Sequence, residues 1–441
     1  MTPHSSFIIH HSSFSFRVGV DLIPLLPGGE NGGAKFVAVE LVRHMSRLAP
    51  DWEFILLTSE KSNDELAFLD SANVRRLCAS KQKSDPESPM TGANRLENLI
   101  RRRLNRFLPM RWRVKLEHAY RKAVTRSRQG GFFSQVGIDL LFCPFTAPSF
   151  HDLSVPAVSI IHDLQYRYYP QFFSPEDHQC RMINFMEACR LSDRLICVSE
   201  YVRRTVLENS DLKSDRVCTI HTRLPNRVSE PAPQAVSSVL RRLGLRENEF
   251  FLYPANFWEH KNHRMLLTAF GMVHARNPGS NLRLVCPGAL EKERRAWREA
   301  ADRMGLGERI VLPGFMLDDD YAAILASCLA LVFPSLFEGF GMPVLEAMAF
   351  RKPVICSNVT SLPEVAGDAA LFIDPRNPRD MAEAMERMAT DETLRKSLID
   401  LGRRRLEVFG GPDTMAREYL DVFLNVMRQP RPTTHTKLRS R

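Results

Sequence analysis

Long hydrophobic runs, paired cysteines and the common nucleotide motifs are all missing from this 441-residue sequence. No uninterrupted apolar stretch approaches the ~20 residues that a membrane-spanning helix needs. None of the nine cysteines forms a Cys-x-x-Cys pair, which argues against a disulfide framework and against a zinc site. There is no G-x-G-x-x-G fingerprint and no Gly-Lys-Ser/Thr phosphate loop, so the sequence indicates neither a redox dinucleotide nor hydrolysis of a nucleoside triphosphate.

The composition is typical of a globular protein with two domains. Hydrophobic residues make up 44% and charged residues 25% of the chain, and the length favours two domains over one. The net charge of +9 indicates an anionic partner, which leaves a membrane surface, a nucleic acid and a phosphorylated substrate all open. Residues 1–15 repeat His-Ser-Ser-Phe without the features of a signal peptide, so we interpret them as disordered or as a wrongly assigned start.

Short apolar runs of strand length alternate with helical patterns along the chain. Strands are predicted at 16–21, 53–58, 74–78, 139–143, 157–161, 194–198 and 217–220, and then at 250–253, 282–286, 309–312, 329–333, 353–356 and 370–373. This alternation predicts an α/β fold with doubly wound parallel sheets. A proline-rich break at 229–234 separates the two series. It predicts domains at 16–230 and 231–411, a last helix at 412–427 and a disordered basic tail at 428–441.

The most informative stretch is 335–349, where a short loop with two glycines joins an apolar strand to a helix. Gly339 and Gly341 allow a ligand to approach the backbone, and the helix N-terminus favours an anion. Glu338 and Glu346 flank this loop with seven residues between them. Since carboxylates repel phosphate but accept hydrogen bonds from hydroxyl groups, the pattern indicates a nucleotide sugar. The alternative is an ordinary strand–helix turn with two surface glutamates.

Three further candidates follow predicted strands, at the edge where parallel sheets bind their ligands. His162 can donate to a sugar hydroxyl or accept its proton, although a structural pair with Asp163 is the alternative. Lys261 opens a predicted helix, where it can meet a phosphate as a point charge or simply be solvated. Gly33 ends a glycine-rich loop at another helix start, which is either part of a ligand cleft or a flexible surface loop.

Two charged segments also have competing interpretations. From Arg95 to Arg128 there are twelve Arg or Lys against two Glu, and the front half has the pattern of a basic amphipathic helix. This helix is expected either to contact an anionic membrane or to pack on its own domain, and the lack of interleaved aromatics argues against nucleic acid. The acidic triplet at 318–320 is expected to cap a helix or occupy its first turn, with a metal site as the less favoured alternative.

The segment from Glu338 to Glu346 resembles the signature of the retaining glycosyltransferases of family four, in which two glutamates enclose seven residues. The resemblance extends over residues 16–425 and implies the GT-B fold, with two Rossmann-like domains facing a cleft and a last helix that returns to the first domain. It implies that His162 and Glu338 are the catalytic residues at the donor sugar, and that Glu346 binds the ribose. The other substrate-binding residues that it implies are Gly33, Asn256, Lys261, Phe340, Gly341, Met342 and Pro343.

Asn256 departs from the family pattern, because the family has an arginine five positions before the lysine that Lys261 matches. Members that resemble bacterial mannosyltransferases of cell-surface polysaccharide synthesis often lack this arginine, so the departure indicates a subfamily. The segment 221–227 also lacks the family's usual Pro-Asn-Gly turn, which leaves the geometry between the two domains open.

The resemblance implies transfer of a hexose, of mannose or glucose type, from a GDP- or UDP-sugar with retention of configuration. The expected acceptor is a glycan or a lipid-linked sugar, the expected location is the cytoplasm or the inner face of the cell membrane, and no cofactor or obligatory metal is expected. The alternatives are a nucleotide-sugar epimerase or a pyridoxal-phosphate phosphorylase of similar fold, and a non-catalytic subunit that binds sugar nucleotides or a partner.

Overall fold

The computed structural model describes residues 14–26, 33–79, 132–150, 154–224 and 229–429. Three sequence predictions lie outside the described residues, either wholly or for the most part: the start at 1–15, the basic segment at 95–128 and the tail at 428–441. Within the described part of the chain, no helix is long and apolar enough to cross a membrane.

The first sheet has seven strands in the order β3-β2-β1-β4-β5-β6-β7. The pairs β1–β2, β2–β3, β1–β4 and β4–β5 are parallel. The strands are β1 (Phe16–Asp21), β2 (Trp52–Thr58), β3 (Val74–Cys78), β4 (Leu140–Cys143), β5 (Ala157–Ile161), β6 (Arg194–Cys197) and β7 (Val217–Thr219). The helices between them are α1 (Gly33–Leu48), α4 (Phe132–Val136), α5 (Gln165–Tyr168), α6 (Pro175–Leu191) and α7 (Glu200–Glu208). The strand order reverses between β1 and β4, which makes their carboxyl ends a topological switch point.

The second sheet has six strands in the order β10-β9-β8-β11-β12-β13, and all five neighbouring pairs are parallel. The strands are β8 (Phe250–Leu252), β9 (Arg283–Val285), β10 (Ile310–Val311), β11 (Ala330–Phe333), β12 (Val354–Ser357) and β13 (Ala370–Ile373). Here the switch point lies between β8 and β11. Every residue of β8, β11 and β12 is buried, as expected for parallel strands covered on both faces.

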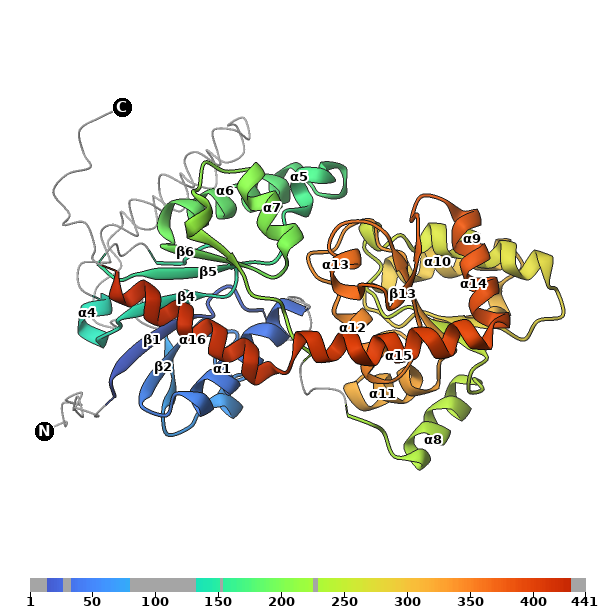
Figure 1. Ribbon diagram of the computed structural model, residues 1–441, viewed down its shortest axis with the longest axis horizontal. Helices are drawn as coiled ribbons and strands as arrows, with labels where there is room; N and C mark the ends of the chain where they lie inside the picture. Colours follow the sequence, from blue (N-terminus) through green and yellow to red (C-terminus); the bar gives the residue numbers. More distant parts are fainter. Residues whose placement is uncertain (1–13, 27–32, 80–131, 151–153, 225–228, 430–441) are drawn as a thin grey trace, which may run out of the picture. The chain divides into compact units, whose positions relative to one another are not determined.

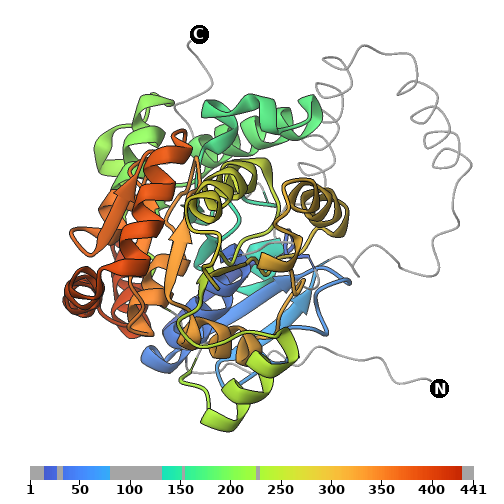
Figure 2. The same cartoon turned by 90° about the vertical axis from the view of Figure 1, so that its right-hand side faces the viewer.

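The helices of this half of the chain are α8 (Pro233–Leu243), α9 (His263–Arg276), α10 (Glu291–Arg303), α11 (Asp318–Ser327), α12 (Met342–Ala349), α13 (Leu362–Ala366), α14 (Pro378–Thr390), α15 (Glu392–Phe409) and α16 (Pro412–Arg428). In Figure 1, α15 runs beside α12, and α14 lies beside α9. Figure 2 shows the second half from the side, with the red helices α14 and α15 on the outside of the orange strands.

The chain folds into two compact units. The first comprises residues 1–160, 185–195 and 420–441, and the second comprises 161–184 and 196–419. In the first unit, Phe423 of α16 packs against Phe142 of β4, with 5.1 Å between the ring centroids. The second unit contains the whole second sheet and also the segments that follow β5 and β6. The domain limits predicted from the sequence, at 230 and 411, stay predictions.

The α/β prediction with two parallel Rossmann-like sheets is confirmed. Each predicted strand is present with its ends within two residues of the prediction. Six helices in the described part of the chain were not predicted: α4, α5, α8, α13, α14 and α15. The proline-rich break at 229–234 runs directly into α8, because Pro233 occupies the first helical turn, where a missing N–H costs nothing.

Candidate active site

Lys261 and Glu338 form an ion pair at the switch point of the second sheet. Lys261 lies in the loop after β8 and Glu338 in the loop after β11, so the two neighbouring strands deliver them to the same edge. The distance from Lys261 Nζ to Glu338 Oε1 is 2.6 Å, and the side chains are 14% and 11% exposed. The ammonium group also lies 5.5 Å from the centroid of the Phe333 ring. An anion that reaches Lys261 therefore meets a cation that is largely shielded from water, which strengthens the attraction.

The backbone around Lys261 is held by buried hydrogen bonds. The Tyr253 hydroxyl donates to the Lys261 carbonyl over 2.5 Å, and burial raises the pKa of Tyr253 well above its ordinary value. Asn262 adopts a left-handed conformation with a φ of 62°, and its amide donates to the carbonyls of Pro334 and Pro375. These bonds join the loop after β8 to the loop after β11, so the ion pair is positioned by the fold.

The loop 338–340 has each of its carbonyl groups fixed by a serine hydroxyl. The Ser361 hydroxyl lies 2.9 and 3.0 Å from the carbonyl oxygens of Glu338 and Phe340 and shares its one proton between them, and Ser199 donates to the Gly339 carbonyl at 2.7 Å. The amide of Glu338 donates to the Thr360 hydroxyl at 3.2 Å. The backbone of this loop therefore has a fixed orientation before any ligand arrives.

Helix α12 begins directly after this loop. Gly341 precedes the helix with a φ of 101°, a conformation that disfavours any residue with a side chain. Among the described residues, the amides of Gly341 and Met342 have no hydrogen-bond acceptor. Pro343 has no amide hydrogen, so it cannot donate and instead fits the first turn of the helix. The helix N-terminus thus offers two amide donors and the positive end of its dipole to an anion.

Glu346 lies in the same helix, and its side chain is buried. The hydroxyl of Tyr321, from α11, donates to Glu346 Oε2 over 2.8 Å. Tyr321 is itself 6% exposed. Tyr321 therefore orients the Glu346 carboxylate, which the sequence predicts to bind a ribose. The sequence alone did not indicate this orienting role of Tyr321.

The backbone of His162 reaches the same loop. His162 follows β5, and a Cβ placed on Gly339 would lie 1.9 Å from the His162 carbonyl oxygen. Only a glycine permits this close approach. Position 339 must therefore be glycine because the His162 backbone lies against it. The sequence prediction gave a different reason, namely that a glycine lets a ligand approach the backbone.

The remaining predicted residues have different environments. Phe340 is buried, and its ring packs edge-on against Phe409, so only its backbone is available to a ligand. Asn256 accepts a hydrogen bond from the Ala289 amide at 2.8 Å and so braces the loop after β9. Gly33 is the first residue of α1, in the other unit, and is exposed. The structure thus brings together all the predicted residues of the loop and helix N-terminus with Lys261 and the His162 backbone.

Two histidines beside Lys261 are uncharged near neutral pH. Burial, and next the positive charge of Lys261, lower the pKa of His260 to about 2 and that of His263 to about 3. Neither histidine therefore adds a positive charge beside Lys261.

The acidic triplet at 318–320 forms the first turn of α11, as one of the two interpretations predicted. Leu317 occupies the N-cap position, so no acidic side chain caps the helix, and Asp320 pairs with Arg242 at 2.6 Å. In the described part of the chain, no group of three or more His, Cys, Asp or Glu side chains is arranged to hold a metal ion.

Two parallel Rossmann-like sheets, with a helix N-terminus and the Lys261–Glu338 pair at the second switch point, fit the GT-B class of glycosyltransferases. The chain matches the family model of group 1 glycosyl transferases over residues 241–405 and that of glycosyltransferase family 4 over residues 31–223. The chain therefore contains a glycosyltransferase family 4 domain followed by a group 1 glycosyl transferase domain.

Curated relatives include mannosyltransferases of Escherichia coli. The serotype-specific mannosyltransferase WbdA is 33% identical over 214 residues, which are 47% of this chain and 26% of WbdA. The O-antigen chain mannosyltransferase B is 28% identical over 262 residues, which are 57% of this chain and 66% of that protein. The chain thus spans only part of the length of these relatives.

Solved structures share the fold at low sequence identity. Alr3699/HepE of Anabaena, in complex with UDP and glucose, has a TM-score of 0.66 at 14% identity and covers 93% of this chain and 100% of its own. WaaG, a glycosyltransferase involved in lipopolysaccharide biosynthesis, has a TM-score of 0.63 at 13% identity and covers 92% of this chain and 99% of its own. These likenesses confirm the GT-B fold class.

Proposed function

We propose that this glycosyltransferase moves a mannose-type hexose from a nucleotide-diphosphate sugar to a glycan or lipid-linked acceptor, with retention of configuration. The observation that carries the proposal is the Lys261–Glu338 pair beside the amides of Gly341 and Met342, which have no acceptor in the described part of the chain. These groups combine a cation, two N–H donors and a carboxylate. Together they suit a ligand that has both phosphates and hydroxyl groups.

The diphosphate is proposed to bind at the N-terminus of α12. The amides of Gly341 and Met342 would donate to its oxygens, and Lys261, which has three N–H donors, would contact it while keeping Glu338 as a partner. Glu346 would accept from the ribose hydroxyls, held in place by Tyr321. The mannosyltransferase relatives favour GDP-mannose, and the UDP complex of the structural neighbour makes a UDP-sugar the other candidate.

The proposed reaction breaks the bond between the anomeric carbon and the diphosphate oxygen and forms one to the acceptor oxygen on the same face. The electron pair of the broken bond leaves with the diphosphate, and a phosphate oxygen takes the acceptor's proton. Lys261 and the two amides would stabilise the developing negative charge, which is the larger catalytic contribution expected of such groups. Glu338 and His162 would orient the sugar and support positive charge at the anomeric carbon.

We propose that this chemistry needs no divalent cation, because Lys261 and the helix N-terminus would stabilise the negative charge of the leaving group. Gly33 is proposed as a further substrate-binding residue. We further propose a cytoplasmic location, with peripheral contact to the membrane through the segment from Arg95 to Arg128. A polysaccharide of the cell surface is the acceptor class that the relatives favour.

Thermal unfolding with GDP-mannose and with UDP-glucose tests the donor assignment. A ligand at 100 times its Kd stabilises a protein by about 2.7 kcal/mol, which is readily detected. We expect one of the two sugars to raise Tm in the wild type, and much less in Glu346→Ala. Glu293→Ala, on the exposed side of α10, is the matched control and should respond like the wild type. Equal stabilisation of Glu346→Ala and wild type would refute the ribose assignment.

Turnover distinguishes the transferase from its rivals. A transferase releases the nucleoside diphosphate in proportion to acceptor, whereas an epimerase converts the donor without one and a binding subunit does neither. We expect release of GDP or UDP only when an acceptor glycan is added.

A further inference from the structure

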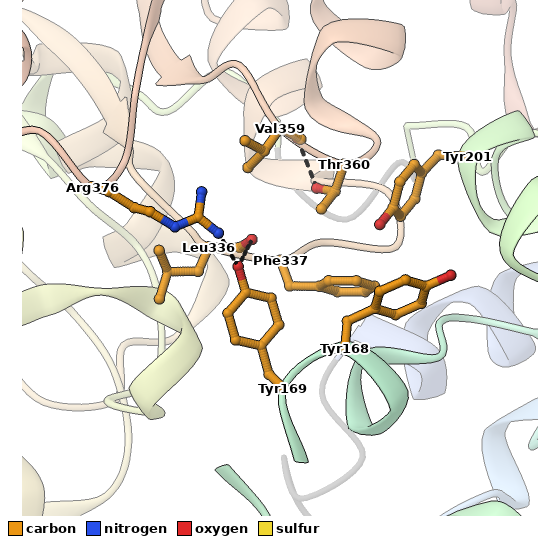
Figure 3. A pocket seen from close by; sticks show the side chains of 8 residues that line it. All are labelled: Tyr168, Tyr169, Tyr201, Leu336, Phe337, Val359, Thr360 and Arg376. Atoms are coloured by element: carbon orange, nitrogen blue, oxygen red, sulfur yellow. Dashed lines mark hydrogen bonds between the residues drawn. The ribbon is translucent and has the colours of Figure 1, made fainter. Parts of the chain in front are cut away.

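A pocket with a volume of about 390 Å³ lies beside the loop that holds Glu338. Eight residues line it, and Figure 3 shows their side chains: Tyr168, Tyr169, Tyr201, Leu336, Phe337, Val359, Thr360 and Arg376. All eight belong to the second unit. None of them was predicted as a site residue, and the volume falls within the roughly 300–1,000 Å³ usual for sites that bind small molecules.

The floor of the pocket is aromatic. The buried ring of Phe337 stacks with Tyr168 at 5.6 Å, and the rings of Tyr169 and Tyr201 meet it edge-on at 6.1 and 5.7 Å. Four aromatic rings thus enclose a small volume and place hydroxyl groups around an apolar surface. A sugar ring matches this surface, because it presents C–H groups on its faces and hydroxyl groups at its edge.

One hydroxyl in this pocket is available to a ligand. In Figure 3 the Tyr201 hydroxyl points toward the space above Phe337, and it has no hydrogen-bond partner among the described residues. Burial, followed by the neighbouring Tyr168 and Tyr169, raises the pKa of Tyr201 to about 12. The group therefore keeps its proton near neutral pH and can donate.

The pocket also contains a cation without an acidic partner. Arg376 Nη2 donates to the Tyr169 hydroxyl over 2.6 Å, and the same hydroxyl lies 3.4 Å from the Leu336 carbonyl oxygen. Within the described part of the chain, no carboxylate forms an ion pair with Arg376, whose other N–H groups remain available. A guanidinium binds carboxylate and phosphate groups through paired hydrogen bonds, so the charge favours an anionic occupant.

From this combination we propose that the pocket binds a sugar residue that carries one anionic group, either a carboxylate or a phosphate, as part of the acceptor glycan. The aromatic floor would contact the sugar ring, Tyr201 would donate to a ring substituent, and Arg376 would pair with the anion. The inference rests on the proposed function, since it identifies the class of acceptor for that reaction.

The pocket adjoins the candidate active site through two residues. Phe337 directly precedes Glu338. The hydroxyl of Thr360, which lines the pocket, accepts a hydrogen bond from the Glu338 amide at 3.2 Å. A sugar bound here would therefore touch the loop that carries the catalytic carboxylate. This placement suits an acceptor unit near the reacting hydroxyl.

Titration with simple glycosides tests the proposal directly. The probes are methyl α-D-glucuronide, mannose 6-phosphate, methyl α-D-glucoside and inorganic phosphate, added to the full-length wild-type protein in phosphate-free buffer. We expect one of the two anionic sugars to bind at least about tenfold more tightly than the neutral glucoside and than inorganic phosphate, as charge-assisted hydrogen bonds imply. The preferred anionic sugar then identifies the anion as a carboxylate or a phosphate.

Two variants assign this binding to the pocket. Arg376→Gln should reduce the affinity for the anionic sugar to that for the neutral glucoside. Arg379→Gln removes the same charge from an exposed position three residues away, outside the pocket, and should have no effect. The proposal is overturned if the anionic sugars bind no better than the glucoside, if inorganic phosphate binds as tightly as they do, or if both variants behave alike.

Binding of GDP-mannose and UDP-glucose to the same proteins separates this inference from the proposed function. Arg376→Gln should bind the donor as the wild type does. If neither donor binds although the anionic sugar does, the proposed function fails while the pocket assignment stands. If a donor binds and no anionic sugar does, the pocket assignment fails while the proposed function stands.

Discussion

Replacing Gly339 by alanine tests whether two backbone segments really meet at the candidate site. A Cβ at this position would lie 1.9 Å from the His162 carbonyl oxygen and 3.0 Å from its carbonyl carbon. Real Cβ atoms essentially never approach another atom within 3.0 Å, so the two segments must separate by about 1 Å or more. Both neighbouring atoms are backbone, so a change of side-chain rotamer cannot relieve the contact.

The loop has little freedom to move away. Ser199 holds the Gly339 carbonyl at 2.7 Å, and Ser361 holds the carbonyls on either side. We therefore expect Gly339→Ala to lower the free energy of unfolding by roughly 2–3 kcal/mol, as for overpacked cores. Displacement of Glu338 from Lys261 should also weaken donor binding, by about tenfold for a lost charge-assisted contact.

Urea unfolding and calorimetric titration with GDP-mannose or UDP-glucose measure the two effects. Gly279→Ala is the matched control, because an added Cβ there meets nothing within 4 Å and the backbone has no positive φ. If Gly339→Ala unfolds and binds the donor as Gly279→Ala does, then the His162 backbone does not lie against this loop, and the site geometry is wrong.

Two further predictions concern buried polar groups. Tyr321→Phe removes the hydroxyl that orients Glu346, so the donor's KM should rise by several fold with kcat nearly unchanged. The free energy of unfolding should fall by roughly 1 kcal/mol. An unchanged KM would show that Tyr321 does not position the carboxylate proposed to bind the ribose. Burial raises the pKa of Asp21, at the carboxyl end of β1, to about 6, although hydrogen bonds from the Ser149 and Ile23 amides act to lower it. The favourable contribution of protonated Asp21 is thus complete below its unfolded pKa near 3.8 and is lost as the pH rises through 6. Asp21→Asn should gain about 2.4 kcal/mol relative to wild type between pH 4 and pH 7 in urea unfolding, and a constant difference would contradict the burial of an ionisable group at this position.

The sequence was sufficient for the fold class and for the strand–loop–helix unit at 335–349, because both depend on local pattern. Alternating apolar runs identify parallel strands, and the two glycines mark a backbone that must adopt or permit an unusual geometry. The ends of the strands were predicted closely, since burial on both faces makes each run almost wholly apolar.

Contacts between distant segments were not predictable from this pattern. Ser199 is the N-cap of α7 and accepts a hydrogen bond from the Val202 amide, yet its hydroxyl also donates to the Gly339 carbonyl. Tyr321 sits in an ordinary apolar helix pattern, and its hydroxyl has a purpose only once Glu346 is placed beside it. Such roles depend on residues far apart in the chain, and no local propensity carries that information.

The segment 221–227 also makes contacts with distant residues that the sequence pattern does not predict. The sequence distinguishes it only by the absence of the family's turn, but Arg223 in it is buried and forms three hydrogen bonds. Its guanidinium donates to the carbonyls of Phe409 and His221 and pairs with Glu418 at 2.8 Å. A buried charge of this kind is tolerated only with such partners, which a sequence pattern does not reveal.

We propose that main-chain amides and Lys261 hold the diphosphate without a metal ion. Calorimetric titration of GDP and UDP in the presence of EDTA tests this, with wild type, Lys261→Gln and the control Lys292→Gln on the exposed side of α10. We predict that one nucleotide binds the wild type and Lys292→Gln equally in EDTA, and binds Lys261→Gln at least about tenfold more weakly. Binding that disappears in EDTA, or that is the same in all three proteins, would contradict the account.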